Sequence, residues 1–302
     1  MGKTFKIWLI IATSLIVVGG ILFVVGMTGK KWDFSKLSTE KYETNFSLVS
    51  EEFKQISIKV ETADISVVPV EDATCKIVFY EHEKVKHLAT VSDETLTISV
   101  VDQRQWYDHI GISVSSPKII IYLPEKEYVS LNIKGSTGNV EILNDIQTEN
   151  VDISISTGNI TLQNLTVDKM SLSVSTGDIK VSSVDCEREV KLKGETGKTT
   201  LSDIQCGSLY SKASTGKAVL SNVIATDVFL VERSTGDVKF EGCDAGEIQI
   251  KTSTGKVAGS LLSEKNFFAH TSTGKINVPK TTTGGKCAIT TSTGDIKVEI
   301  TQ

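Results

Sequence analysis

The chain has 302 residues, of which 39% are apolar, a composition typical of a folded protein and not of a disordered one. Its net charge is −5 with both signs interspersed, which excludes the basic surface that nucleic-acid binding needs, so no nucleic-acid partner is expected. Proline is scarce, at four residues, whereas Ser, Thr, Val and Ile are abundant, so the soluble part is predicted to be nearly all β.

An apolar segment near the N-terminus, residues 7–27, reads IWLIIATSLIVVGGILFVVGM and carries no charge over 21 residues. As a helix it would span roughly 31 Å at about 1.5 Å per residue, which matches the hydrocarbon core of a bilayer. A cleaved signal peptide has a shorter apolar region and a small-residue cleavage site. We therefore predict a retained transmembrane helix whose partner is the lipid bilayer.

Basic residues flank this helix on both sides, with Lys3 and Lys6 before it and Lys30, Lys31 and Lys36 after it. Because the two counts are close, the positive-inside rule does not place the rest of the chain. Residues 28–45 are polar and predict a stalk. Within it, Trp32 and Phe34 either rest at the membrane interface or pack against the first strands.

A Thr-Gly pair recurs in steps of 19 or 20 residues, a period that indicates a repeat architecture. The nine pairs begin at Thr137, Thr157, Thr176, Thr196, Thr215, Thr235, Thr254, Thr273 and Thr293, and a Ser precedes all but one, where Glu195 stands. Apolar residues recur six, four and two places before the Thr, three and five places after it, and eight and ten places after it, as at Leu165 and Val167. Each rung is therefore predicted to hold three short inward-facing runs separated by turns.

Rungs stacked about 4.8 Å apart would pair their main-chain groups with the neighbouring rungs and join the apolar rows into one core. The Gly is expected at a corner that needs a positive φ or a close backbone approach. The Thr has the parity of the inward row. We therefore expect its hydroxyl to reach the corner backbone and its methyl to join the core, while the Ser stays exposed.

The two ends of the stack are predicted to differ. An atypical first rung fits the same template, with Ala63 in place of Gly, at Ile56, Ile58, Val60, Thr62, Ile65 and Val67. The strand-like runs CKIVFY, TLTISVV, IGISV and KIIIYLP follow it and predict a cap over the N-terminal end. The C-terminus ends within a rung, at IKVEITQ, so the last edge is predicted to be uncovered.

The apolar helix, the opening FKQISIKVETADISVV, the KIIIYLP run and the tandem STGDI or STGNI rungs together resemble the bacterial putative-adhesin family, a domain-of-unknown-function family of extracytoplasmic β-strand-repeat proteins, over about residues 46–301. The resemblance implies a single-stranded right-handed parallel β-helix outside the cytoplasmic membrane, often in Gram-positive bacteria and near envelope-stress regulators. It implies no active site, because the family has none to carry over. It also decides the orientation, since long domains translocate largely regardless of flanking charge.

The predicted architecture is an all-β solenoid with rungs of 19–20 residues behind one transmembrane α-helix. Its parts are a cytoplasmic tail at 1–6, the transmembrane helix at 7–27, the stalk at 28–45, the N-terminal β cap with the first atypical rungs at 46–134, and the solenoid repeats at 135–302. The protein is expected to be a single-pass protein of the cell membrane with its bulk outside the cytoplasm.

The five cysteines are an odd number without a C-x-x-C spacing, so neither a zinc site nor a redox pair is indicated. Cys186 and Cys206 both lie ten places after their Thr and should stack on adjacent rungs, within reach of a disulfide. We favour small core hydrophobes, because Val167, Ala225 and Ala245 hold the same position in other rungs and stacked side chains point in parallel.

The residue after each Gly forms an outward column in which every Asp has a Lys neighbour. A calcium-binding solenoid needs carboxylates massed on adjacent rungs, so no metal is expected. We expect exposed ion pairs, each worth about 0 to 1 kcal/mol, between Asp178 and Lys198, between Asp237 and both Lys217 and Lys256, and between Asp295 and Lys275.

The four histidines are scattered, and no nucleophile motif such as G-x-S-x-G is present. A polysaccharide-cleaving β-helix would expose aromatic side chains for sugar stacking, but Phe229, Phe240 and Phe267 have inward parity. The aromatic loop from Trp106 to His109 either binds a ligand or tucks Trp106 against the first rungs, and we favour the second.

These features predict a non-enzymatic, membrane-anchored protein, either an adhesin or an envelope-interaction or stress-related protein, whose outer faces bind a cell-wall polymer or an envelope protein. No catalytic, cofactor or metal residue is assigned. The alternative is a polysaccharide-acting enzyme of the envelope. That alternative requires Asp, Glu and Lys side chains converging in one groove across several rungs.

Overall fold

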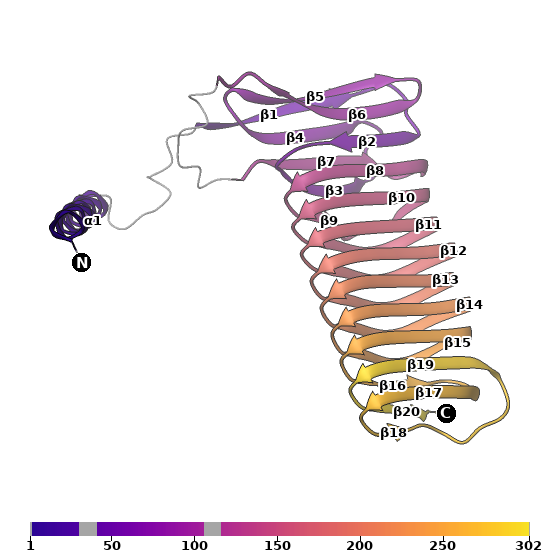
Figure 1. Cartoon of the computed structure of the whole chain (residues 1–302). Helices are drawn as coiled ribbons and strands as arrows, with labels where there is room; N and C mark the ends of the chain where they lie inside the picture. Colours follow the sequence, from indigo (N-terminus) through magenta and orange to yellow (C-terminus); the bar gives the residue numbers. More distant parts are fainter. Residues whose placement is uncertain (1, 30–40, 106–115, 302) are drawn as a thin grey trace.

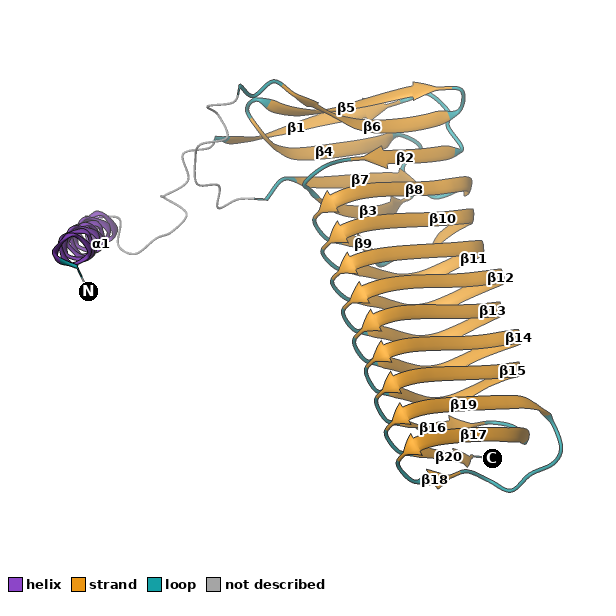
Figure 2. Cartoon of the chain, in the orientation of Figure 1, coloured by secondary structure: helices purple, strands orange, loops and turns teal. Residues whose placement is uncertain are grey.

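A computed structural model describes residues 2–29, 41–105 and 116–301. Within these ranges the chain forms one helix, α1 (Lys3–Gly29), and twenty strands that belong to one continuous sheet. The sheet is wound into a solenoid of about nine turns (Figures 1 and 2). The predicted all-β solenoid is confirmed, whereas its right-handed winding stays a prediction.

Helix α1 contains all of the predicted apolar segment 7–27. It is long and apolar enough to cross a bilayer, with a mean hydropathy of 2.7 in the segment Phe5–Gly29. A signal sequence near the N-terminus would pass the same test, so the helix is compatible with either a membrane anchor or a signal sequence. Trp32 and Phe34 lie outside the described residues.

Seven strands precede the repeats: β1 (Tyr42–Val49), β2 (Gln55–Lys59), β3 (Asp64–Val70), β4 (Cys75–His82), β5 (Val85–Ser92), β6 (Thr95–Asp102) and β7 (Lys118–Pro124). The predicted first rung is confirmed, because β2 and β3 pair in parallel with the first repeat rung and Thr62 bridges to Thr137. On its other side, β6 and β7 pair with β2 and β3, and β1, β4 and β5 are added by antiparallel pairing. These strands cover the N-terminal end of the stack, as predicted (Figure 1). The run IGISV at 110–114 lies outside the described residues.

The repeats follow as β8 (Glu127–Thr137), β9 (Val140–Ile142), β10 (Ile146–Thr157), β11 (Ile160–Thr176), β12 (Ile179–Thr196), β13 (Thr199–Thr215), β14 (Ala218–Thr235), β15 (Val238–Thr254), β16 (Val257–Leu261), β17 (Lys265–Thr273), β18 (Ile276–Asn277), β19 (Gly285–Thr293) and β20 (Ile296–Ile300). Strands β10 to β15 stack in parallel in chain order. In these strands each Thr of a Thr-Gly pair aligns with the next one, as Thr157 does with Thr176. The repeats therefore form a rod (Figure 1).

Each rung holds three inward-facing runs, as predicted. In strand β11, the first run is Ile160 and Leu162, the second is Leu165 and Val167, and the third is Met170, Leu172 and Val174, all of them buried. The turn between the first and second runs is made by one residue with a positive φ, such as Asn164 at 55°. Ser183, Asp203, Asn222 and Gly242 share this conformation in the following rungs. A short polar residue or Gly at this place is what a left-handed corner favours.

Each rung turns at three corners: the Thr-Gly pair, the positive-φ residue between the first and second runs, and a bulge that follows the second run. The register between β11 and β12 shifts there, between Val167 and Lys169, and the same shift recurs between the next rungs down to β15. At this bulge the rungs absorb the one-residue difference between lengths of 19 and 20, so the other two corners stay aligned.

The glycine of the Thr-Gly pair is required for two reasons. Gly177 has a φ of 142°, a conformation that other residues rarely adopt. A Cβ atom added to it would also lie 1.9 Å from the carbonyl oxygen of Gly158 in the preceding rung. The same close contact recurs down the column of corner glycines. The predicted role of the glycine is confirmed.

The threonine of the pair is exposed, so the prediction that it points inward is wrong. At this corner both Ser156 and Thr157 face solvent, and the strict strand alternation ends at Ile155, which is buried. The inward place at the corner therefore belongs to the residue two positions before the Thr. In three late rungs this residue is itself a threonine: Thr252, Thr271 and Thr291 donate to the carbonyl oxygens of Gly236, Gly294 and Gly255 at 3.1, 3.0 and 3.1 Å. These residues perform the role that was expected of the Thr-Gly threonine.

The last two rungs are stacked in reverse order. Strands β19 and β20 pair with β15 and β16, and the earlier strands β17 and β18 pair with the far side of β19 and β20 (Figure 1). The prediction that IKVEITQ forms the uncovered last edge is wrong for its first two residues, because Ile296 and Lys297 of β20 lie between β16 and β18. This order buries Cys287 and Ile289 of β19 completely and leaves Ile276 of β18 46% exposed in the end rung.

Candidate functional surfaces

In the column of residues after each Gly, the Asp side chains are hydrogen-bonded to the main chain of a neighbouring rung. Asp178 Oδ1 accepts from the main-chain N–H of Lys198 at 2.7 Å. The same bond joins Asp237 to Lys256 at 3.0 Å and Asp295 to Lys275 at 2.9 Å. Of the predicted ion pairs, only Lys217 with Asp237, at 3.6 Å, forms among the described residues. The column thus ties successive corners together, and the prediction of a row of ion pairs was wrong in its main part.

All five cysteines are buried and carry free thiols. Cys186 and Cys206 align on adjacent rungs, as predicted. Burial raises the pKa of Cys206 and of Cys287 to about 12, so neither is a reactive thiolate near neutral pH. The interpretation of Cys186 and Cys206 as core residues is confirmed.

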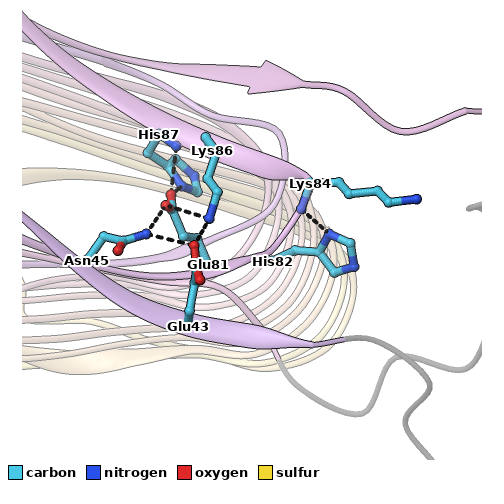
Figure 3. Close-up of polar contacts among 7 residues, drawn as sticks. All are labelled: Glu43, Asn45, Glu81, His82, Lys84, Lys86 and His87. Atoms are coloured by element: carbon cyan, nitrogen blue, oxygen red, sulfur yellow. Dashed lines mark hydrogen bonds and ion pairs between the residues drawn. The ribbon is translucent and has the colours of Figure 1, made fainter.

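A buried acid–histidine pair lies in the cap. The side chains of Glu81, in β4, and His87, in β5, are 2% and 1% exposed, and Glu81 Oε2 lies 2.9 Å from His87 Nδ1 (Figure 3). The same oxygen accepts from the His87 main-chain N–H at 2.7 Å, and Asn45 Nδ2 of β1 donates to Glu81 Oε1 at 2.8 Å. One carboxylate therefore holds three strands together.

Lys86 extends this cluster toward the surface. Its ammonium group lies 3.6 Å from Glu81 Oε1 and hydrogen-bonds to Glu43, which lowers the pKa of the Glu43 carboxyl group (Figure 3). The His87 ring stacks on Phe79 with 5.6 Å between centroids, and its Nε2 is buried without a partner among the described residues. An acid–histidine pair can serve in proton transfer, but a substrate would have to reach the imidazole. With this burial, the cluster is structural.

A second buried charge lies in the repeats. Arg233 is 3% exposed and occupies the inward corner position two before Thr235. Its guanidinium donates to neutral acceptors, namely the carbonyl oxygens of Ser211 and Glu232 and the Ser211 hydroxyl, at 3.0, 2.8 and 2.9 Å. Burial lowers its pKa to about 10. The buried Ser211, small for a core position, leaves room for this head group.

A groove of about 590 Å³ lies where the cap meets the solenoid. We call it the junction groove, and it is lined by Glu52–Lys54, Glu94, Lys126–Val129, Gln147–Glu149 and Thr166–Asp168. Its residues come from the segment before β2, the β5–β6 turn, the β7–β8 turn with the start of β8, and strands β10 and β11. No sequence motif marks it, because its lining comes from five separate parts of the chain.

The floor of the junction groove holds two stacked aromatic rings beneath a lysine. Phe53 and Tyr128 lie 6.0 Å apart between centroids, and both are nearly buried. The Lys126 ammonium group lies 4.8 Å from the Phe53 centroid and 5.3 Å from the Tyr128 centroid. These are cation–π distances. On the rim, Lys54 pairs with Glu94 at 3.1 Å.

The chain matches the model of one known protein family. The model of the Toastrack DUF4097 family matches residues 53–216 and 189–302, nearly the whole solenoid and most of the cap. The chain belongs to the Toastrack family. The predicted resemblance to a family of unknown function with repeated strands is thereby confirmed. A search of curated proteins finds none that matches this Toastrack chain.

Several solved structures are distantly similar to this Toastrack protein. A putative adhesin from Bacteroides fragilis is 16% identical with a TM-score of 0.45, and the match covers 86% of this chain and 97% of that one. A putative adhesin from Parabacteroides merdae is 15% identical with a TM-score of 0.38, covering 75% and 98%. A putative lipid binding protein from Parabacteroides distasonis is 16% identical with a TM-score of 0.36, covering 74% and 95%. Likeness this distant transfers no ligand to the Toastrack chain.

The aromatic side chains of the repeats lie where the sequence predicts. Phe229 and Phe240 are buried and Phe267 is half-buried, whereas Phe268 is 55% exposed on the end rung. The described rungs therefore offer no extended aromatic platform for sugar stacking. The loop from Trp106 to His109 lies outside the described residues.

The junction groove meets one requirement of the enzyme alternative, since it brings carboxylates and lysines together across several rungs. Acid–base cleavage of a glycoside also needs two carboxyl groups in contrasting environments. Glu52, Glu127 and Glu149 are exposed, whereas Glu94 pairs with Lys54 and the half-buried Asp168 pairs with Arg188. Among the described residues, no group of three His, Cys, Asp or Glu side chains could hold a metal ion.

Proposed function

We propose that this Toastrack protein is a non-enzymatic, membrane-anchored rod outside the cytoplasm, whose outer faces bind a cell-wall polymer or an envelope protein. The observation that carries the proposal is the exposed column of hydroxyl groups at the Thr-Gly corners. Ser156 and Thr157 both face solvent, and the Thr of every following pair is exposed as well. A rigid rod with evenly spaced hydroxyl groups offers a repeating polymer many weak contacts, whose sum can give high avidity.

The proposed arrangement keeps the order predicted from the sequence. Residues 1–6 form a cytoplasmic tail, 7–27 cross the membrane, 28–45 form a stalk, 46–134 form the cap with the first rungs, and 135–302 form the solenoid. We place the rod in the envelope of a Gram-positive bacterium on the family resemblance alone. In this arrangement the cap lies nearer to the membrane along the chain, and the last rungs extend away from it.

Binding is tested by co-sedimentation of the full chain, held in neutral detergent micelles, with purified cell-wall sacculi. We expect sedimentation to weaken when the exposed Thr at three of the corners, Thr157, Thr176 and Thr215, is replaced by Ala. A matched variant that replaces the exposed hydroxyl residues Thr90, Ser92 and Thr290 should sediment like the parent chain. Absence of sedimentation, together with absence of an envelope protein cross-linked in cells, would refute the proposal.

The enzyme alternative has its own test. The full chain is incubated with wall polysaccharide, and new reducing ends are measured. We expect none above the level of a heat-unfolded sample. Release of reducing ends that disappears in the Glu127→Gln variant would establish the enzyme and refute the non-enzymatic proposal.

A further inference from the structure

The junction groove is part of a larger acidic surface. Two further hollows of about 480 and 410 Å³ adjoin it, and Gln147 lines all three. Nine carboxylates and two lysines line them together: Glu52, Glu94, Glu125, Glu127, Asp145, Glu149, Asp168, Asp185 and Asp203, with Lys54 and Lys126. Because the whole chain has a net charge of −5, the rest of the molecule is positive on balance. The negative charge is concentrated on this one concave surface.

Few of these carboxylates are neutralised from outside the surface. Arg188 pairs with Asp168 at 2.9 Å, and Asn222 Nδ2 donates to Asp203 at 2.9 Å. Glu52, Glu127, Asp145 and Glu149 are exposed at the rim. Negative side chains lining a concave surface focus the potential there and raise the local concentration of cations.

The floor of the junction groove shows what kind of group it can hold. The chain places its own Lys126 ammonium group over the faces of Phe53 and Tyr128. The lysine is exposed, so it can swing away at little cost, whereas the two rings are fixed by burial. Tyr128 is held further by its hydroxyl, which donates to the Pro124 carbonyl oxygen at 2.7 Å. A preformed aromatic site with a replaceable ammonium group suits another ammonium group.

We propose that the junction groove and its two adjoining hollows bind an extended, lysine-rich peptide segment of an envelope protein, with one lysine replacing Lys126 over Phe53 and Tyr128. A peptide fits better than a single amine because the carboxylates extend from the cap along strands β10, β11 and β12. This assignment rests on the proposed function, to which it adds the chemical class of one partner and its place on the rod.

The test uses the full chain in neutral detergent micelles and fluorescein-labelled octalysine as the probe, with binding followed by fluorescence anisotropy. We expect saturable binding that weakens as salt is raised, and no binding of octaglutamate. The double variant Glu127→Gln with Glu149→Gln removes two rim carboxylates. It should weaken binding about tenfold, because each exposed charge pair contributes up to about fivefold to the affinity. The control pair Asp152→Asn with Glu299→Gln makes the same change in net charge at exposed positions outside the groove and should leave the affinity within about twofold.

A second pair of variants tests the aromatic site. Lys126→Ala removes the internal competitor and should tighten octalysine binding by about threefold or more, within the range of one exposed cation–π contact. Lys134→Ala removes one exposed positive charge elsewhere and should have a smaller effect. Circular dichroism and the thermal midpoint show whether each variant is folded.

Three results would overturn the proposal: no binding of octalysine, equal weakening in both carboxylate pairs, or equal tightening in both lysine variants. Tighter binding of a glucosamine oligomer than of octalysine would overturn the assignment to a peptide. Co-sedimentation with sacculi does not depend on the junction groove. Failure of the groove proposal can therefore be told apart from failure of the proposed function.

Discussion

Thr254 pairs with Thr293 and not with Thr273, although Thr273 belongs to the next Thr-Gly pair along the chain. Thr293 in turn pairs with Thr273, so the rung that comes last in the chain lies inside the stack. A similar reversal occurs at the other end, where β2 and β3 lie between the later strands β6 and β7 and the first repeat rung. Both ends of the rod thus contain a rung that is stacked out of chain order.

The rung order can be tested with pairs of engineered cysteines. Lys251, His270 and Thr290 are exposed, and Lys251 aligns with Thr290, which aligns with His270. We expect Lys251→Cys with Thr290→Cys to form a disulfide under mild oxidation, because adjacent rungs are about 4.8 Å apart and these exposed side chains, unlike the buried Cys186 and Cys206, are free to turn toward each other. Lys251→Cys with His270→Cys should not, because two rungs exceed the Cα separation that a disulfide allows. Stacking in chain order predicts the reverse, and the bands on a non-reducing gel decide between them.

The corner glycines provide a test of backbone strain. Gly177→Ala combines a positive φ with a Cβ atom 1.9 Å from the Gly158 carbonyl oxygen, so it should lower the free energy of unfolding by at least about 2 kcal/mol. Gly194→Ala is the matched control, because its Cβ would meet Ala213 Cβ at 3.4 Å and its φ is not in the positive region. The control should be neutral or stabilising by about 0.4 to 1 kcal/mol. Urea unfolding of both variants measures the difference, and similar midpoints would contradict the account of the corner.

The buried thiols predict how stability changes with pH. Burial raises the pKa of Cys75 and Cys243 to about 11 and of Cys206 and Cys287 to about 12, from an ordinary value of 9.0. Between these values the folded state keeps protons that the unfolded state has released, so the free energy of unfolding should fall as pH rises above about 9. The lowered pKa of Arg233 acts in the opposite direction, but only above about 10.

Urea unfolding at a series of pH values measures this slope. Cys206→Ala is a suitable variant, because Ala225 occupies the same position in the next rung, and it should make the decline shallower. The folded protein should also leave all five thiols unreactive toward a thiol reagent, and all five should react after unfolding without reductant. Fewer than five reactive thiols after unfolding would reveal a disulfide and contradict the five free cysteines.

The sequence predicted the features that repeat and missed those that occur once. Alternation placed Ile153, Leu162 and Val167 in the core correctly, since burial of one face is a period-two property that each rung shows again. It misplaced the Thr-Gly threonine because alternation stops at the corner, where two successive side chains face solvent. The rung reversal and the junction groove depend on contacts between segments far apart in the chain, which no local pattern records. One signal could have been used: Glu81 and Arg233 carry charges at inward positions, and such positions mark buried polar clusters.

The buried carboxylate of Glu81 gives the last prediction. Replacing it with Leu leaves the Asn45 amide and the His87 ring without their acceptor in a buried place, so unfolding of the cap should become easier by about 3 to 5 kcal/mol. The double variant Glu81→Leu with His87→Leu removes both polar partners and should recover much of this loss, since an apolar pair can replace a buried polar pair. Glu43→Gln, at an exposed partner of Lys86, should leave cap opening close to that of the parent chain. Hydrogen exchange of the amides in β4 and β5 reports cap opening directly. If the double variant opened as easily as Glu81→Leu alone, the pair would not be the contact that holds these strands together.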